Sequence, residues 1–295
     1  MGWLGDSTVA RLRAIAAVPD LGDLRYELLE EIGRGGMGVV YLARDTQLER
    51  QVAVKALNLT DGSGEAADRL LAEARILARL EHPGIVPVHD AGVLPDGRIY
   101  YAMKLVRGTR LDRFSETKPP LPELLRTFCR VCEPVGFAHS QGVFHRDLKP
   151  ANIMVGKFGE VLVLDWGLAL DGMTGGTPEF MAPEQARGDR VSARSDVYAL
   201  GKTLAFLLQR GGMRAPKPLV SIIRKATNPD AGMRYTGALE LADDVARFLD
   251  GVPVLAHKET IWERAQRFAS RNKVWIALML TYVVVRAVLF FWLGR

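Results

Sequence analysis

Cysteine is scarce in this sequence, and its scarcity excludes a disulfide framework. Only 2 cysteines occur among the 295 residues, Cys129 and Cys132, and they stand in a CxxC spacing. No second pair of cysteine or histidine residues stands at a spacing that would complete a zinc site. Because the pair falls in a stretch with helical apolar periodicity, we expect two packed thiols in a reducing compartment, the alternative being a redox or metal role.

Targeting signals, repeats and long basic runs are also missing. The first residues lack the charged-then-apolar order of a secretory signal peptide, and Asp6 stands where N-myristoylation needs serine or threonine. The net charge of +5 comes from basic residues interrupted by acidic ones, so we expect no nucleic-acid partner. No internal repeat or low-complexity segment is present. The N-terminal part is therefore expected to remain in the cytoplasm.

What is present is the composition of a folded chain, with 48% hydrophobic and 25% charged residues, enough for one core or two modest lobes. After an N-terminal extension over residues 1–24, apolar and polar residues alternate over 26–59, which predicts antiparallel strands. A helical period over 65–80, a second strand region over 86–106 and a helix over 122–140 follow. The sequence thus predicts a sheet-rich first part and a helix-rich second part.

Residues 274–293 form an almost wholly apolar segment. Its roughly 20 residues would span about 30 Å as a helix, which matches the hydrocarbon core of a bilayer, and Trp275 and Trp292 stand near the two interfaces. Arg286 opposes insertion by roughly 2.5 to 3.5 kcal/mol, but each Leu, Ile, Val or Phe contributes about −0.3 to −0.6 kcal/mol. We expect a single transmembrane helix, the alternative being a buried core helix.

The charges beside this segment predict its orientation. Residues 251–273 form a basic juxtamembrane segment, whereas only Arg295 follows the apolar residues. The basic residues nearest the segment are Arg264, Arg267, Arg271 and Lys273. The positive-inside rule keeps such charges in the cytoplasm, so we expect a single-pass protein of the cell (inner) membrane with residues 1–273 in the cytoplasm.

A glycine-rich turn lies between the first two predicted strands. Small residues there let backbone N–H groups approach phosphates closely. With no helix after it, the turn is not a dinucleotide-binding fingerprint, and taken alone it is equally well explained as a plain hairpin. Its residues are Gly33, Arg34, Gly35, Gly36, Met37 and Gly38.

Charged and amide side chains farther along the chain make this turn informative. Lys55 ends an apolar strand, and Glu73 on the predicted 65–80 helix could pair with it, although each alone is more often a solvated charge. The strongest signal is the run 145–152, followed by an apolar strand over 161–164 and then residues 165–167. Phosphoryl transfer needs a carboxylate near the acceptor hydroxyl and oxygen ligands for Mg²⁺, and these are the residue types found at Asp147, Asn152 and Asp165.

These motifs resemble those of the eukaryotic-like (Hanks-type) protein kinases, and more closely their bacterial serine/threonine branch, from about residue 26 to 249. The resemblance implies an α+β, two-lobed kinase fold over residues 25–250, with a β-rich N-lobe and a helical, shortened C-lobe. It implies ATP and Mg²⁺ as cofactors, with Mn²⁺ as a substitute, and protein substrates with Ser or Thr acceptors. It leaves open a homodimer through the kinase lobes or the anchor helix. Lys149 resembles the serine/threonine rather than the tyrosine branch.

The resemblance also implies roles for single residues. Asp147 would be the catalytic base, Lys149 would steady the γ-phosphate, and Lys55, anchored by Glu73, would contact the α- and β-phosphates. The implied metal ligands are Asn152 and Asp165. The remaining nucleotide-binding positions are the turn residues 33–38 with Val40 over the phosphates, Ala53 and Met154 beside the adenine, Met103 as gatekeeper, and Lys104 and Val106 in the hinge.

Further positions match the scaffold of the family or depart from it. Glu184 closes the activation segment and would pair with Arg234, and Asp196 resembles the buried scaffold aspartate. Trp166 replaces the usual phenylalanine, a change that we expect the fold to tolerate. The segment 165–184 is short, with Thr174 and Thr177 as its hydroxyls that could be phosphorylated or, for Thr177, serve a structural role. The interval 201–234 is abbreviated, which puts protein-substrate docking in doubt.

Three functions compete at this point. An active, autophosphorylating signalling kinase is favoured, because every ATP, metal and base position is filled. The alternative is a pseudokinase-like membrane scaffold that binds nucleotide with weak or no transfer. A small-molecule kinase is disfavoured by the intact motifs around Lys149 and Glu184.

Overall fold

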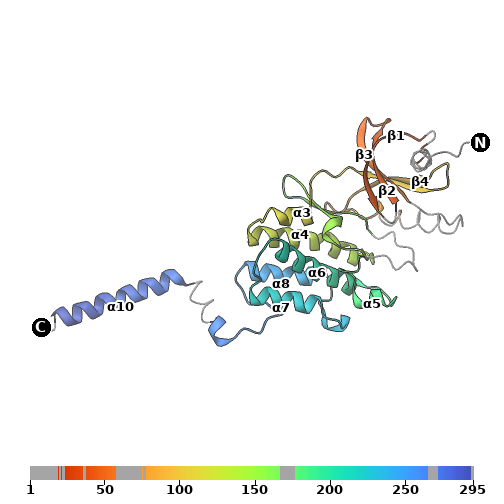
Figure 1. Cartoon of the computed structure of the whole chain (residues 1–295). Coiled ribbons are helices and arrows are strands. Elements are labelled where there is room, and N and C mark those ends of the chain that lie inside the picture. Colours follow the sequence, from red (N-terminus) through yellow and green to blue (C-terminus); the bar gives the residue numbers. More distant parts are fainter. Residues whose placement is uncertain are drawn as a thin grey trace, which may run out of the picture.

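The chain folds into two lobes, one built on a sheet and the other on helices, with a separate helix beyond them (Figure 1). This architecture agrees with the two-lobed arrangement that the sequence predicts. The computed structural model describes residues 19, 21, 24–35, 38–57, 75, 78–166, 177–264 and 272–293.

The first lobe is a five-stranded antiparallel sheet with the strand order β1-β2-β3-β5-β4. Side chains of alternate residues pack on its two faces, as the period of two in the sequence requires. The strands predicted within 26–59 and 86–106 are confirmed, while the predicted 65–80 helix lies outside the described residues except for residues 75 and 78–80. The strands are β1 (Tyr26–Gly35), β2 (Gly38–Asp45), β3 (Arg50–Leu57), β4 (Val88–Val93) and β5 (Ile99–Lys104).

The β1–β2 hairpin carries the glycine-rich turn at its tip. Gly35 pairs with Gly38 across the hairpin, so the described glycines of this segment lie at its end. A Cβ atom at Gly38 would collide with the carbonyl oxygen of Ala56 on β3. Glycine at this position therefore lets β2 approach β3 closely beneath the turn.

The second lobe is helical, with a small three-stranded sheet on the side of the first lobe. Its longest helix, α4, buries Leu124, Phe128, Val131 and Val135 along one face, at the spacing of an amphipathic helix. This confirms the helix predicted over 122–140. The elements are β6 (Thr109–Arg110), α3 (Leu111–Glu116), α4 (Leu121–Ser140), η1 (Pro150–Asn152), β7 (Ile153–Val155), β8 (Val161–Val163), α5 (Pro183–Ala186), α6 (Ala193–Arg210), α7 (Lys217–Ala226), η2 (Ala231–Met233) and α8 (Ala238–Leu249).

Two sequence interpretations concern this lobe. The thiols are free, with Cys132 buried and Cys129 half-buried on α4, and burial raises the pKa of Cys129 to about 11. Within the described range 177–264, only residues 211–216 separate α6 from α7, and none of them is helical. In the interval 201–234, which the sequence analysis interprets as abbreviated, the structure has a short α6–α7 connection.

The C-terminal helix α10 (Lys273–Leu293) lies apart from both lobes (Figure 1). Apart from Ile276, which is half-buried, its described large apolar side chains are exposed, from 47% at Leu289 to 77% at Trp292. The predicted transmembrane helix over 274–293 is not confirmed: within the part of the chain that the structure describes, no helix has the length and apolarity needed to cross a membrane.

A buried ion pair fastens α5 to the loop after η2. The Arg234 guanidinium donates to both carboxylate oxygens of Glu184, at 2.7 and 2.8 Å, and the Ser195 hydroxyl donates to the same carboxylate. Arg234 is 3% exposed and Glu184 8% exposed. The pair predicted between these residues is therefore confirmed, and each charge has a partner in a site from which water is excluded.

Removing one partner of this pair should destabilise the helical lobe strongly. Arg234→Met is expected to lower the free energy of unfolding by about 3 to 5 kcal/mol, because it leaves the Glu184 carboxylate buried without its cation. Urea unfolding followed by tryptophan fluorescence measures the change. Arg187→Met, which removes the cation of the exposed Arg187–Asp189 pair, is the matched control and should cost less than about 1 kcal/mol. Equal losses in the two variants would contradict the assignment.

Candidate active site

Four predicted residues from distant parts of the chain meet where the two lobes adjoin. The Lys55 ammonium on β3 lies 2.6 Å from a carboxylate oxygen of Asp165, which follows β8. The Asn152 amide on η1 donates to the backbone oxygen of Asp147 at 2.9 Å and to its carboxylate at 3.2 Å. The backbone N–H of Leu164 also donates to the carbonyl of Asn152, so Asp165 follows directly beside Asn152. The structure thus brings Lys55, Asp147, Asn152 and Asp165 together.

Lys55 is held as a cation in this site. Burial alone would lower the pKa of its ammonium, but the Tyr101 hydroxyl and the Asp165 carboxylate outweigh burial and raise this pKa above its ordinary value. The Lys55 side chain is 10% exposed, whereas Asp165 is 38% exposed and has a φ of +51°. The site therefore holds a fixed positive charge beside a carboxylate that solvent can reach, an arrangement suited to a triphosphate and its metal.

Asp147 is surrounded by donors. Its carboxylate accepts from the Lys149 ammonium at 2.7 Å and from the Thr177 backbone N–H at 3.0 Å. Lys149 also donates to the Thr177 hydroxyl at 2.7 Å. These contacts fix the orientation of a carboxylate that is still 20% exposed and can accept a proton from an incoming hydroxyl.

The Thr177 hydroxyl is engaged in this network. It lies 3.3 Å from the Asp147 carboxylate as well as accepting from Lys149. A phosphate on this oxygen would stand against the Asp147 carboxylate, so the geometry favours the structural role for Thr177. Thr174, the other hydroxyl named from the sequence, lies outside the described residues.

Buried Asp196 on α6 positions the loop that carries Asp147. Its carboxylate accepts from the backbone N–H groups of His145 and Arg146, at 2.8 and 2.9 Å, and lies 2.8 Å from Nε2 of His139. Arg146 has a φ of +68°, a backbone conformation that the paired N–H groups help to hold. The predicted scaffold aspartate therefore connects α6 to the loop before Asp147.

Trp166 is accommodated beside this loop. Its indole is buried, packs on the His145 ring at 5.0 Å between centroids and donates to the carbonyl of Val163 at 3.1 Å. His145 in turn bonds the carbonyl of Leu164. The larger indole thus has both packing and a hydrogen-bond partner, while Asp165 still faces Lys55.

The other nucleotide-binding positions lie on adjacent strands. Val40 pairs with Lys55, and Ala53 pairs with the predicted gatekeeper Met103. The Arg34 guanidinium donates a hydrogen bond to the Glu31 carboxylate at 2.9 Å. The remaining predicted residues in the described part are Gly33, Gly35 and Gly38 in the hairpin, Lys104 at the end of β5, Val106 after it, and Met154 on β7. Gly36, Met37 and Glu73 lie outside the described residues, so the predicted Lys55–Glu73 pair stays a prediction.

Tyr101 is a residue of this site that the sequence analysis missed. It lies on β5 directly across from Lys55, whose ammonium lies 5.8 Å from the centroid of the Tyr101 ring. Burial raises the pKa of the Tyr101 hydroxyl to about 12. The one available signal was its position two residues before Met103, which puts both side chains on the same face of the sheet.

The donor set suits Mg²⁺. Asp165 offers a solvent-accessible carboxylate, and Asn152 turns its amide N–H group to Asp147, which leaves the amide oxygen as a ligand. Among the described residues no group of three His, Cys, Asp or Glu side chains gathers as a metal site. Mg²⁺ commonly binds through one or two protein oxygens, phosphates and water, so the pair is sufficient.

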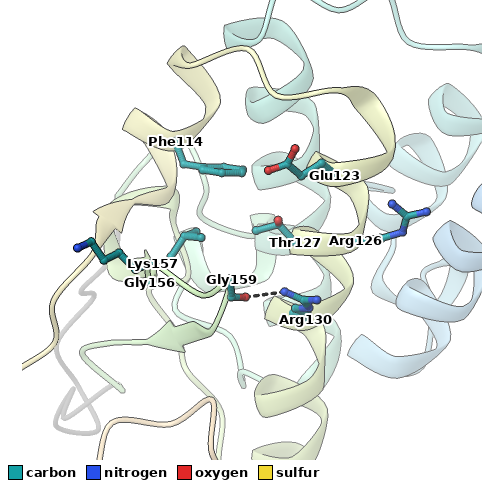
Figure 2. Close-up of a pocket in the computed structure, with 9 residues that line it drawn as sticks. Phe114, Glu123, Arg126, Thr127, Arg130, Gly156, Lys157 and Gly159 are labelled. Atoms are coloured by element: carbon teal, nitrogen blue, oxygen red, sulfur yellow. Dashed lines mark hydrogen bonds between the residues drawn. The ribbon is translucent and has the colours of Figure 1, made fainter.

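A separate cavity of about 260 Å³ lies between α3, α4 and the β7–β8 turn (Figure 2). Phe114 and Glu123 point toward one another across it, and Arg130 donates to the carbonyl of Gly159 at 2.6 Å. Its lining includes neither Lys55 nor Asp147, so it is distinct from the candidate active site.

Comparison with known proteins agrees with this geometry. A family model described as the protein kinase domain matches residues 26–220. The serine/threonine-protein kinase PknD of Chlamydia trachomatis is 34% identical, with 80% of this chain and 33% of PknD covered. The DNA damage-responsive serine/threonine-protein kinase RqkA of Deinococcus radiodurans is 36% identical, with 89% of this chain and 40% of RqkA covered. The chain therefore spans a third or slightly more of the length of these relatives.

Solved structures show the same fold. The crystal structure of the Mycobacterium tuberculosis PknI kinase domain superposes with a TM-score of 0.66 at 27% identity. The superposition covers 80% of this chain and 100% of that domain.

Asp196→Asn should destabilise the fold in a pH-dependent way. At pH 7 we expect a loss of about 1 to 3 kcal/mol in the free energy of unfolding, because an amide N–H would face backbone N–H groups. Burial favours a higher pKa for Asp196, but the His139 and backbone contacts outweigh it and hold this pKa below its ordinary value of 3.8. The wild-type advantage is therefore complete above that value and is lost as the pH falls through the folded-state pKa.

Urea unfolding at pH 7 and at about pH 3 measures this dependence. Asp189→Asn, at an exposed carboxylate, is the control and should not change the free energy of unfolding appreciably at either pH. A loss for Asp196→Asn that stays constant between the two pH values would contradict the assignment.

Proposed function

Because this chain belongs to the protein kinase domain family, in its bacterial serine/threonine branch, we propose that it transfers the γ-phosphoryl group of ATP to serine or threonine hydroxyls of proteins. The observation that carries this proposal is the convergence of Lys55 and Asp165 with the Asp147–Lys149–Thr177 network where the two lobes adjoin. A cation for phosphates, a carboxylate for a hydroxyl proton and oxygen ligands for a metal are then within reach of one triphosphate.

The proposed reaction assigns each side chain one task. The acceptor oxygen bonds to the γ-phosphorus as the bond from this phosphorus to the β,γ-bridging oxygen breaks, and the hydroxyl proton passes to Asp147. Lys149 lies 2.7 Å from Asp147 and can move to the transferring phosphoryl oxygens. Lys55 holds the α- and β-phosphates, while Asn152 and Asp165 would hold Mg²⁺, which neutralises charge on the phosphate oxygens when bound.

The alternative proposal is a pseudokinase-like scaffold that binds nucleotide without transferring phosphate. The observation in its favour is the short α6–α7 connection over residues 211–216. It lies in the interval 201–234, where the resemblance to the family predicts that a docking helix and loop are reduced or absent. Against it stands the complete set of side chains around Asp147, for which a scaffold has no chemical use. Activity measurements separate the two.

Asp147→Asn should abolish phosphate transfer. The amide cannot accept the hydroxyl proton, so we expect at least a ~10²-fold loss of ³²P incorporation from Mg-ATP into the chain itself and into a general protein substrate. Binding of Mg-ATP, followed by calorimetry, should change little, because Asp147 faces the acceptor side. Asp189→Asn, at an exposed position of the same lobe, is the matched control and should remain active.

The same samples distinguish an active kinase from a pseudokinase-like scaffold. Wild-type protein that binds Mg-ATP but modifies neither itself nor the added substrate would support the scaffold and contradict the kinase.

We further propose autophosphorylation at Thr174 rather than at Thr177, whose hydroxyl is engaged by Lys149. Mass spectrometry of the reacted wild type locates the phosphates, and phosphate on Thr177 alone would refute this site.

We also propose that α10 attaches the kinase to the cell membrane with the catalytic lobes in the cytoplasm. Support comes from the exposed apolar side chains around this helix, including Trp275 and Trp292 near its ends. A continuous exposed apolar surface of this kind is rare on a soluble protein. Arg286 is the charge that opposes burial in lipid.

Removing α10 should release the protein from membranes. After lysis and ultracentrifugation we expect the full chain in the membrane fraction, retained after a carbonate wash, and a variant lacking residues 272–295 in the supernatant. Arg286→Leu, which removes the opposing charge, is the control and should stay in the membrane fraction. Full-length protein in the supernatant would refute the attachment.

A further inference from the structure

Two neighbouring apolar side chains of the helical lobe, Ile261 and Trp262, stand almost fully in solvent. Ile261 is 83% exposed and Trp262 is 84% exposed. Both belong to a short helical turn over residues 261–264, in the segment that follows α8. This segment lies on the side of the helical lobe nearest to α10 (Figure 1). Because burial of such side chains is favourable, an adjacent pair left in water indicates a surface that meets a partner.

Hydrogen bonds between backbone and side chains define this turn. The Glu263 backbone N–H donates to the Thr260 hydroxyl at 3.3 Å, and the Thr260 backbone N–H donates to the Glu263 carboxylate at 2.9 Å. This reciprocal pair is a capping box, which starts the helical turn directly after Thr260. The backbone of Ile261 and Trp262 is therefore held in place while both side chains stay exposed.

Side-chain contacts also fasten the turn to α7. The Lys217 ammonium on α7 lies 3.2 Å from the Glu263 carboxylate. The Ser221 hydroxyl, one helical turn farther along α7, lies 3.0 Å from Nδ1 of His257, whose Nε2 is 3.3 Å from Glu263. These contacts connect residues before and within the turn to one helix. The exposed pair is thus carried by the helical lobe itself.

The exposed charged side chains in and beside the turn are basic. The acidic residues nearest to it in sequence, Glu259 and Glu263, are half-buried, and Glu263 is paired with Lys217. Residues 264–295 include further basic residues and no acidic one. A partner for this surface is therefore expected to carry negative charge. The exposed cations are Lys217 and Arg224 on α7, and Lys258 and Arg264 on the segment of the turn.

An anionic membrane surface meets both requirements. Tryptophan and aliphatic side chains bury favourably at the boundary between headgroups and acyl chains, and nearby lysine and arginine attract anionic headgroups. A second copy of the chain would bring the same cations to the contact, and like charges repel. An acidic protein would satisfy the cations, but the chain continues from this turn to the apolar helix α10, which favours lipid.

We propose that the turn over residues 261–264 contacts an anionic lipid surface, with Ile261 and Trp262 at the headgroup boundary and the exposed cations facing the headgroups. The inference rests on the proposed function in one respect, namely that α10 attaches the chain to a membrane. It goes beyond that function because a second contact, made by the helical lobe itself, would set the orientation of the catalytic lobes relative to the bilayer.

The first test separates the turn from α10. A variant lacking residues 272–295 keeps the turn, and the match to the whole PknI kinase domain indicates that the lobes fold without α10. This variant is sedimented with vesicles of phosphatidylcholine alone and of phosphatidylcholine mixed with phosphatidylglycerol. We expect binding to the anionic vesicles only, weakened by 0.5 M NaCl as a roughly chosen screening concentration.

Substitutions in the shortened variant show whether the apolar pair makes the contact. Ile261→Ser combined with Trp262→Ser should weaken binding to the anionic vesicles about tenfold or more, because two apolar side chains no longer enter the boundary. Phe158→Ser is the matched control, since it removes a 94% exposed aromatic side chain from the β7–β8 turn of the same lobe. It should change binding by less than about twofold. Thermal unfolding verifies that each variant is folded.

The second test uses the full chain reconstituted into the same vesicles. Ile261→Cys and, as its control, Phe158→Cys are labelled with an environment-sensitive fluorophore. Wild type treated with the same reagent gives the background from Cys129 and Cys132, which are half-buried and buried. We expect blue-shifted emission from position 261 in the anionic vesicles and a solvent-like spectrum from position 158. This measurement decides the inference if the shortened variant is unfolded.

Several outcomes would overturn the inference. These are equal binding by the double-serine variant and its parent, equal binding to the two kinds of vesicle, or a solvent-like label at position 261. A blue shift without vesicles that grows with protein concentration would indicate a second copy instead. Failure of the α10 attachment is seen separately, as full chain in the supernatant after a carbonate wash. Vesicle binding by the shortened variant would still support the turn in that case.

Discussion

The ion pair between Lys55 and Asp165 is the contact on which the two-lobed arrangement of the site depends. It joins a strand of the first lobe to the segment after β8 of the second, at 2.6 Å. Because Asp165 is 38% exposed, the pair contributes little to the free energy of unfolding and can open without loss of the fold. The pair matters for its position: it places a buried cation directly beside an accessible carboxylate, where both could meet a metal-bound triphosphate under the proposed function.

The buried contacts of the helical lobe are more stable than this exposed pair. Asp196 and the Glu184–Arg234 pair are buried, and their charges are satisfied by several donors each. Such groups are costly to leave unpaired, so the loop around Asp147 and the α5 region have one stable arrangement. The molecule thus combines a helical lobe whose buried contacts hold the loop of Asp147 with a more exposed contact, between Lys55 and Asp165, that can open.

The sequence analysis identified the residues whose roles are indicated by short sequence motifs. Asp147, Asn152 and Asp165 follow from a local run of residues, and their convergence with Lys55 agrees with the expected cleft. The positioning part of the site was less predictable, because it depends on pairing at a distance. Tyr101 becomes a partner of Lys55 only through the register of β3 and β5, and the Thr177 hydroxyl reaches Asp147 across 30 residues of sequence. Neither contact produces a periodic pattern in the sequence from which it could be predicted.

The short connection between α6 and α7 is accommodated by the packing around it. A Cβ atom at Gly201 would lie 2.7 Å from the Cβ of Ala226, so glycine allows α7 to pack closely on α6. Leu219, Ile222 and Ala226 of α7 are fully buried there. The helical lobe is therefore closed and well packed without a further helix, and Asp196, on the same helix α6, keeps its contacts to the loop of Asp147. None of the contacts described above around Asp147 and Lys55 involves residues 211–216. Under the proposed function, a reduced docking surface there would therefore limit which proteins are phosphorylated and would leave the transfer step itself intact.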